Sequence, residues 1–211
     1  MEHKPRMLIA RLFRLIMTFL LTIVFFLFAL WLVASIDGIG HVVVARFFGD
    51  STAYYFLIKR TPTGSYCMGC WGYHNVSSDI EALFVDLSGL IFTQFFAILL
   101  STALKTKLRN YLPRPWITIL VVLLLLDLPF QLLQAFRPLQ FLQSLGPLPQ
   151  THSVPKSGVD LADFIYLLSL RTNIKIFVIQ IALVSAAIIY LLFMAWLLNG
   201  ALTSSRKTVT C

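Results

Sequence analysis

Residues 15–41 read LIMTFLLTIVFFLFALWLVASIDGIGH, and no charged residue occurs in this stretch before Asp37. A helix that crosses a bilayer needs roughly 20 mostly apolar residues, so the stretch predicts a transmembrane helix. Its last five residues place an acid and an imidazole four positions apart, which puts Asp37 and His41 on one face of that helix. Ionisable side chains within a membrane are costly to keep and are by default candidates for function.

The whole chain has the composition of a membrane protein. Of its 211 residues, 58% are hydrophobic and only 12% are charged, which excludes an ordinary soluble domain. Apolar segments of sufficient length predict about four transmembrane helices, near residues 15–48, 82–104, 116–136 and 174–198. We therefore expect an all-α polytopic membrane protein with a single domain over residues 1–211, in contact with the lipid bilayer.

The net charge of +8 predicts membrane orientation rather than nucleic-acid binding. The basic residues gather at the ends of the apolar segments and not on a soluble face. With four spans, the three most basic regions lie on one side of the membrane, and the positive-inside rule makes that side and the N-terminus cytoplasmic. These regions contain Lys4, Arg6, Arg11 and Arg14, then Lys105, Lys107, Arg109 and Arg114, and finally Arg206 and Lys207.

The loop over residues 49–79 predicts a short β-hairpin after the first span. Two β-prone runs, Tyr54–Ile58 and the run that resumes at Tyr66, flank Thr61-Pro62-Thr63-Gly64, which has turn composition. The second run contains a C-x-x-C motif, Cys67-Met68-Gly69-Cys70, with two residues between the cysteines. A structural disulfide is the favoured use because this loop would face outward; half of a metal site or a redox pair are the alternatives.

Residues 137–159 are apolar but contain several prolines and glycines, so they cannot form an ordinary span. Backbone that is not helical at membrane depth must be buried in protein or face water. We expect a re-entrant or interfacial segment here. Asp160 then begins an amphipathic helix, with Asp163 also in its first turn, where the helix dipole favours acids.

Three of the four predicted spans carry polar side chains that are expected to face a common interior. The second span contains Asp86 with Gln94 on the same face, and the third contains Asp127 and Gln131. Asp86, Asp127 and Gln131 therefore form a predicted intramembrane polar cluster beside Asp37 and His41. Such groups either pair with one another to fix helix packing or serve a function, and the sequence leaves both open.

The run from Asp37 to Asp50 resembles the first core helix of the site-2 protease family of intramembrane zinc metalloproteases. In that family the helix reads approximately H-E-L-G-H-x-x-x-A-R-x-x-G, and a membrane-associated β-hairpin follows it. Val85–Thr93 resembles the next core segment weakly, and Asp127-Leu128-Pro129 and Ser157–Asp160 fall in the order of the later ones. The positions that match in the first helix are Gly40, His41, Ala45, Arg46 and Gly49.

The resemblance implies a zinc site, but the residues that would build it are changed. Asp37 stands where the family has its first histidine ligand, Gly38 where it has the catalytic glutamate, and Ser157 where it has the aspartate ligand. Glycine cannot take a proton from a zinc-bound water, so classical proteolysis is not expected. Asp37, His41 and either Asp127 or Asp160 remain candidate ligands for zinc or another divalent ion.

We therefore predict a degenerate site-2 protease-like core without proteolytic activity. It would act as a binding or regulatory membrane subunit, alongside other membrane proteins or as a homo-oligomer. Two alternatives stay open. One is an atypical metal-dependent intramembrane protease that uses Asp37, His41 and Asp160 as ligands and another acid, such as Asp86, as base. The other is a small oligomeric transporter that uses the intramembrane acids.

Overall fold

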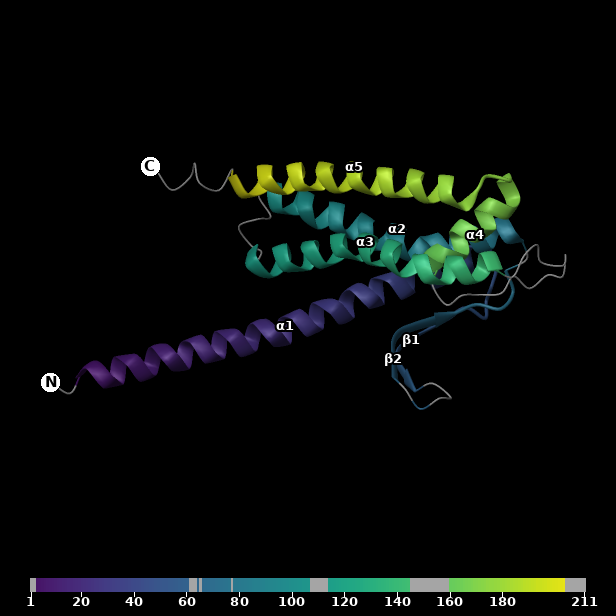
Figure 1. Cartoon of the computed structure of the whole chain (residues 1–211). Coiled ribbons are helices and arrows are strands. Elements are labelled where there is room, and N and C mark those ends of the chain that lie inside the picture. Colours follow the sequence, from purple (N-terminus) through teal and green to yellow (C-terminus); the bar gives the residue numbers. More distant parts are fainter. Residues whose placement is uncertain are drawn as a thin grey trace.

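The computed structural model describes residues 3–60, 64, 66–76, 78–106, 114–144 and 160–203. Four of its helices are long and apolar enough to cross a membrane, and a two-stranded sheet follows the first of them (Figure 1). The predicted four-span helical fold with a hairpin after the first span is thereby confirmed. The elements are α1 (His3–Phe47), β1 (Tyr54–Arg60), β2 (Tyr66–Gly72), α2 (Asp79–Lys105), α3 (Arg114–Ser144), α4 (Asp160–Thr172) and α5 (Ile176–Thr203).

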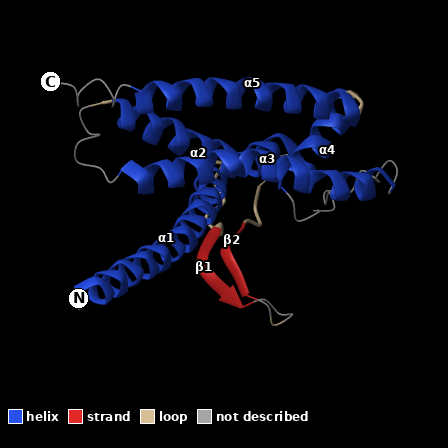
Figure 2. Cartoon of the chain, turned by 60° about the vertical axis from the view of Figure 1, so that its left-hand side comes forward, coloured by secondary structure: helices blue, strands red, loops and turns tan. Residues whose placement is uncertain are grey.

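Helices α2, α3 and α5 form a bundle, and the short helix α4 packs across one end of it (Figure 1). Helix α1 joins this bundle through its C-terminal part only, while its N-terminal part leans away (Figures 1 and 2). Large apolar side chains there, such as Phe19 and Leu27, are exposed, as expected for contact with lipid. The interior between α1, α2, α3 and α5 is filled by Val33, Ala97, Val121, Leu124 and Met194.

The candidate spans of the structure cover residues 11–47, 80–105, 115–136 and 176–199. They differ from the predicted spans by a few residues at most, because length and apolar composition define both. Helix α3 runs on to Ser144, so residues 137–144 prolong a helix despite Pro138. Residues 145–159 lie outside the described part of the chain, and the re-entrant or interfacial segment stays a prediction.

The hairpin is antiparallel, with Tyr54 opposite Gly72 and Arg60 opposite Tyr66. It lies beside the C-terminal part of α1 (Figure 2). Gly69 makes this contact possible, because it has a left-handed φ of 71° and a β-carbon on it would lie 2.7 Å from the backbone oxygen of Ala34. Glycine at this position therefore lets β2 touch the backbone of α1.

Cys70 forms a disulfide bond. The side chain of Cys67 lies outside the described part of the chain. The pairing of Cys67 with Cys70 therefore stays a prediction.

A buried carboxylate ties the end of α1 to the segment that follows β2. One oxygen of Asp50 accepts hydrogen bonds from the backbone N–H and the hydroxyl of Thr52, at 2.8 and 2.5 Å. The other accepts from the backbone N–H groups of His74 and Asn75, at 2.7 and 2.9 Å. Burial alone acts to raise the pKa of Asp50, but these hydrogen bonds outweigh it and hold that pKa well below its usual range.

Replacing Asp50 with alanine is expected to loosen the hairpin from α1. Each backbone donor that loses a charged acceptor is left without its hydrogen bond, so we expect amide exchange at His74 and Asn75 to accelerate by about tenfold. Because the folded pKa is depressed, the anchor contributes stability above the ordinary aspartate pKa of about 4 and loses it as the pH falls further. Hydrogen-exchange mass spectrometry measures both effects, and Thr52→Val, which removes one donor only, should give a smaller change.

Candidate metal centre

Three side chains from two helices converge beside the membrane-embedded part of α1. Asp37 and His41 lie one turn apart on α1, and Asp160 is the first residue of α4. One potential ligand atom from each lies within 4.8 Å of the other two. His41 Nε2 is 3.5 Å from Asp37 Oδ2 and 3.2 Å from Asp160 Oδ2. The structure thus brings together Asp37, His41 and Asp160, which the sequence suggests as candidate metal ligands.

The imidazole of His41 is held in one orientation by its surroundings. Nδ1 lies 2.6 Å from the backbone oxygen of Val85, and because a carbonyl only accepts, Nδ1 carries the proton and donates it. The ring of Trp71 on β2 stacks on the imidazole, with 3.7 Å between centroids and 10° between planes. In the neutral ring, Nε2 therefore bears the lone pair, which is the arrangement of a metal-binding histidine with an outer hydrogen-bond partner.

His41 Nε2 is a buried polar atom without a hydrogen bond. The side chain is only 1% exposed, and Nε2 has no hydrogen-bond partner in the described part of the chain, although two carboxylates are near. A neutral lone pair that faces two carboxylates is unfavourable. Either a proton on Nε2, which makes His41 an imidazolium paired with both acids, or a metal cation between the three groups removes the repulsion. One imidazole and two carboxylates fit Zn²⁺ and also harder divalent ions such as Mn²⁺.

Gly89 on α2 leaves the space beside these ligand atoms open. A β-carbon on Gly89 would collide with Nε2 of His41 and with Oδ1 of Asp37. On α1, Gly40 directly precedes His41 and lets α1 approach α2, because a β-carbon there would lie 2.9 Å from the Ser88 backbone oxygen. Gly40 and Gly89 thus both allow close contact between α1 and α2. Of these two glycines, only Gly89 lies against the candidate ligand atoms.

The position of the missing glutamate is closed by the hairpin. A β-carbon on Gly38 would lie 2.7 Å from the backbone oxygen of Gly69 and 2.8 Å from the ring of Tyr55. Backbone atoms cannot move aside as the end of a flexible side chain can. The structure therefore leaves no room for a longer side chain at position 38, where the resemblance would place a glutamate.

The other positions that match the site-2 protease pattern have roles in the fold. Ala45 is completely buried against the hairpin side of α1. The guanidinium of Arg46 donates two hydrogen bonds to the backbone oxygen of Ala53, at 3.2 and 3.0 Å. Gly49 has a left-handed φ of 91° just after α1 ends. These residues fix the turn from α1 into the hairpin.

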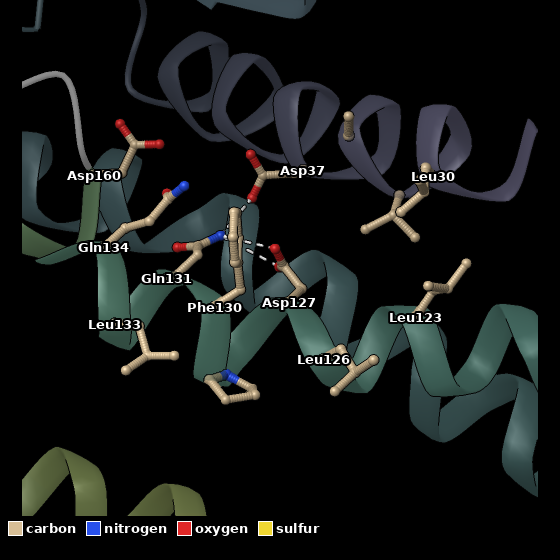
Figure 3. A pocket seen from close by; sticks show the side chains of 13 residues that line it. Leu30, Asp37, Leu123, Leu126, Asp127, Phe130, Gln131, Leu133, Gln134 and Asp160 are labelled. Atoms are coloured by element: carbon tan, nitrogen blue, oxygen red, sulfur yellow. Dashed lines mark hydrogen bonds between the residues drawn. The ribbon is translucent and has the colours of Figure 1, made fainter. Parts of the chain in front are cut away.

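A pocket of about 660 Å³ extends from the candidate ligands between α1 and α3. Most of its lining is apolar. In Figure 3, Asp160 lies toward one end of the pocket, Asp37 lies near its middle, and Leu30 and Leu123 lie toward the other end. The side chains of the two acids are 21% and 26% exposed. The candidate metal centre is therefore accessible from this pocket, whereas His41 is not.

The predicted polar cluster is divided between two places. Gln131 Nε2 donates to Asp37 Oδ1 at 3.2 Å and to Asp127 Oδ2 at 3.3 Å (Figure 3), so Asp127 and Gln131 adjoin the candidate ligands. Asp86 is buried next to the segment after the hairpin and accepts a hydrogen bond of 3.3 Å from the hydroxyl of Tyr73. Burial and then the charge of Asp86 raise the pKa of Tyr73 above its usual range.

Comparison of the chain with protein-family models, with curated proteins and with solved structures finds no match. The family assignment therefore stays a prediction that rests on residues 37–50 and on the hairpin.

Proposed function

We propose that this integral membrane protein holds a divalent metal ion between Asp37, His41 and Asp160 on a degenerate site-2 protease-like core, and that it binds a membrane partner without cleaving it. The observation that carries the proposal is the buried Nε2 of His41, which has no hydrogen-bond partner among the described residues and lies within 3.5 Å of two carboxylates.

The electrostatics of the site support an ion. Two carboxylates held close together in a poorly solvated place repel each other, and a like-charge pair of this kind is costly within a membrane. In the neutral imidazole, the hydrogen bond from Nδ1 to the backbone oxygen of Val85 leaves the lone pair on Nε2, where a cation could take it. A bound divalent cation would neutralise both carboxylates and could polarise an oxygen atom of a molecule in the adjoining pocket.

Binding without cleavage follows from the position of Gly38. The zincin reaction requires a glutamate next to the first ligand as general base, and here the hairpin occupies the space that such a side chain would need. The pocket between α1 and α3 has mostly apolar walls and is also lined by the candidate ligands Asp37 and Asp160. This lining favours an apolar occupant, and we propose a transmembrane segment of another membrane protein.

A second candidate function is an atypical metal-dependent hydrolase, which one observation favours. Asp127 lines the same pocket as Asp37 and Asp160, and Gln131 links it to Asp37. A carboxylate in this position could take up a proton in place of the absent glutamate. The sequence nominated Asp86 for that role, but Asp86 is bonded to Tyr73, and Asp127 is the better candidate.

Titration of the detergent-purified full chain with Zn²⁺ and Mn²⁺ tests the proposal. We expect one tight metal site per chain. We expect His41→Gln and Asp160→Asn each to lower the metal affinity by more than the roughly 10- to 100-fold that loss of an outer-sphere partner causes. Asp127→Asn is the matched control, because Asp127 lines the same pocket but lies outside the group of converging ligand atoms. Binding that is unchanged in both ligand variants would overturn the proposal.

The metal-loaded protein in vesicles, mixed with fluorogenic single-span peptides, separates the two functions. We expect the wild-type chain to leave every peptide intact. Metal-dependent cleavage that is lost in Asp127→Asn, with metal content retained, would favour the hydrolase.

A further inference from the structure

Asp127 is an acid near the middle of a membrane span. The span of α3 covers Pro115–Phe136, and the side chain of Asp127 is partly exposed and lines the pocket between α1 and α3. Figure 3 shows its carboxylate directed from α3 toward α1. A molecule in this mostly apolar pocket can therefore reach a carboxylate at membrane depth.

The hydrogen-bond partners of Asp127 are neutral. Its Oδ2 lies 2.7 Å from the hydroxyl oxygen of Thr93, and Nε2 of Gln131 donates to its two oxygens at 3.4 and 3.3 Å. Within the described part of the chain, no basic side chain forms an ion pair with Asp127, because the ion pairs there join His41 to the two acids of the candidate metal centre. No partner of Asp127 in that part of the chain carries a positive charge.

The spans of this chain also supply no lysine or arginine at the depth of Asp127. Residues 15–45, 80–104, 115–136 and 176–199 contain neither. A charged acid within a bilayer is costly, and such acids usually have a partner. A cation for Asp127 within the spans would therefore come from another molecule.

We infer that the transmembrane segment bound in this pocket carries a lysine or arginine near the middle of its apolar stretch, and that this cation pairs with Asp127. The inference rests on the proposed function, which places a segment of another membrane protein in the pocket, and it states which segments bind. A carboxylate has about four lone-pair sites, so Asp127 can accept from the cation and keep both neutral partners.

The depth of Asp127 selects the source of the cation. A basic residue near an end of the segment would extend its side chain to the membrane surface instead. The amine of a phospholipid headgroup also lies at the surface, roughly 15 Å from the bilayer centre. A basic residue in the middle of a transmembrane segment meets the carboxylate at its own depth.

Binding of synthetic single-span peptides to the metal-loaded full chain in vesicles, measured by fluorescence energy transfer, tests the inference. The peptides share one leucine-rich sequence and carry lysine, leucine or glutamate at the central position. We expect the wild-type chain to bind the lysine peptide about 5- to 30-fold more tightly than the leucine peptide, and the glutamate peptide most weakly. Moving the lysine by seven residues, roughly 10 Å along the helix, should remove the preference.

Asp127→Asn separates charge pairing from general fit. The amide has nearly the shape of the carboxylate, and Asp127 lies outside the group of converging ligand atoms. The variant should therefore keep its metal and its affinity for the leucine peptide, and it should lose the preference for lysine. Asp86→Asn is the matched control, because Asp86 is an intramembrane acid that does not line this pocket, and it should keep the preference.

The outcomes distinguish failure of the inference from failure of the proposed function. Equal binding of the lysine, leucine and glutamate peptides, or a lysine preference that survives in Asp127→Asn, would overturn the inference and leave the proposed binding of a membrane segment in place. Failure of every peptide to bind the wild-type chain would overturn both.

Discussion

Replacing Gly89 with alanine is expected to abolish metal binding in a chain that keeps all three candidate ligands. The new methyl group would occupy the space next to Nε2 of His41 and Oδ1 of Asp37. The ligand atoms would have to separate, and a close-packed interior gives little room for that. Metal content measured by inductively coupled plasma mass spectrometry should fall from about one equivalent, as proposed for the wild type, to near zero.

A control distinguishes this effect from general damage to the helix crossing. Gly40→Ala also forces α1 and α2 apart, because its β-carbon would meet Phe92 and the Ser88 backbone oxygen at 2.9 Å, but these nearest atoms belong to none of the three candidate ligands. Both variants should lower the thermal stability of the protein in detergent, by about 1–3 kcal/mol for an overpacked contact. Only Gly89→Ala should lose the ion at temperatures where both are folded. Full metal occupancy in Gly89→Ala would refute the placement of the site.

Introducing a glutamate at position 38 is expected to damage the protein and not to create a protease. The side chain would start 2.7 Å from the Gly69 backbone oxygen and 2.8 Å from the Tyr55 ring, so the hairpin would have to leave α1. We expect Gly38→Glu to lower the free energy of unfolding by at least the roughly 1–3 kcal/mol of an overpacked site. Thermal unfolding in detergent and limited proteolysis of the hairpin measure the effect.

Gly38→Ala provides the graded comparison, since it adds the clashing β-carbon without a charge. Its stability should lie between those of the wild type and Gly38→Glu. A Gly38→Glu variant that is as stable as the wild type and cleaves single-span peptides in a metal-dependent manner would show that the position is open. In that case the chain would differ from an active protease by its side chains only.

The parts of the fold that depend on local pattern could be predicted from the sequence. Apolar segments of spanning length define the four spans, and Pro62 and Gly64 mark the turn between two β-prone runs. The pairing of Asp37 with His41 on one face of α1 follows from helical periodicity alone. The order of motifs along the chain suggests Asp160 as a ligand. Its placement beside His41 depends on the position of α4, which helical periodicity does not predict.

The contacts that define the centre could not be predicted. The Val85 backbone oxygen that holds His41 is 44 positions away along the chain, and a carbonyl group has no side-chain signature. The stacking of Trp71 depends on how the hairpin folds back on α1. The closure of Gly38 by Gly69 joins two glycines that each look permissive in the sequence. Long-range packing decides all three.

X-ray absorption spectroscopy of the purified full chain loaded with one equivalent of Zn²⁺ tests the central claim most directly. The account predicts a first shell of nitrogen and oxygen at about 2.0–2.2 Å, with the scattering pattern of one imidazole, and predicts that this pattern disappears in His41→Gln. A sulfur shell at about 2.3 Å, which would place the ion on the cysteines of the hairpin, or a spectrum identical in wild type and His41→Gln would contradict it.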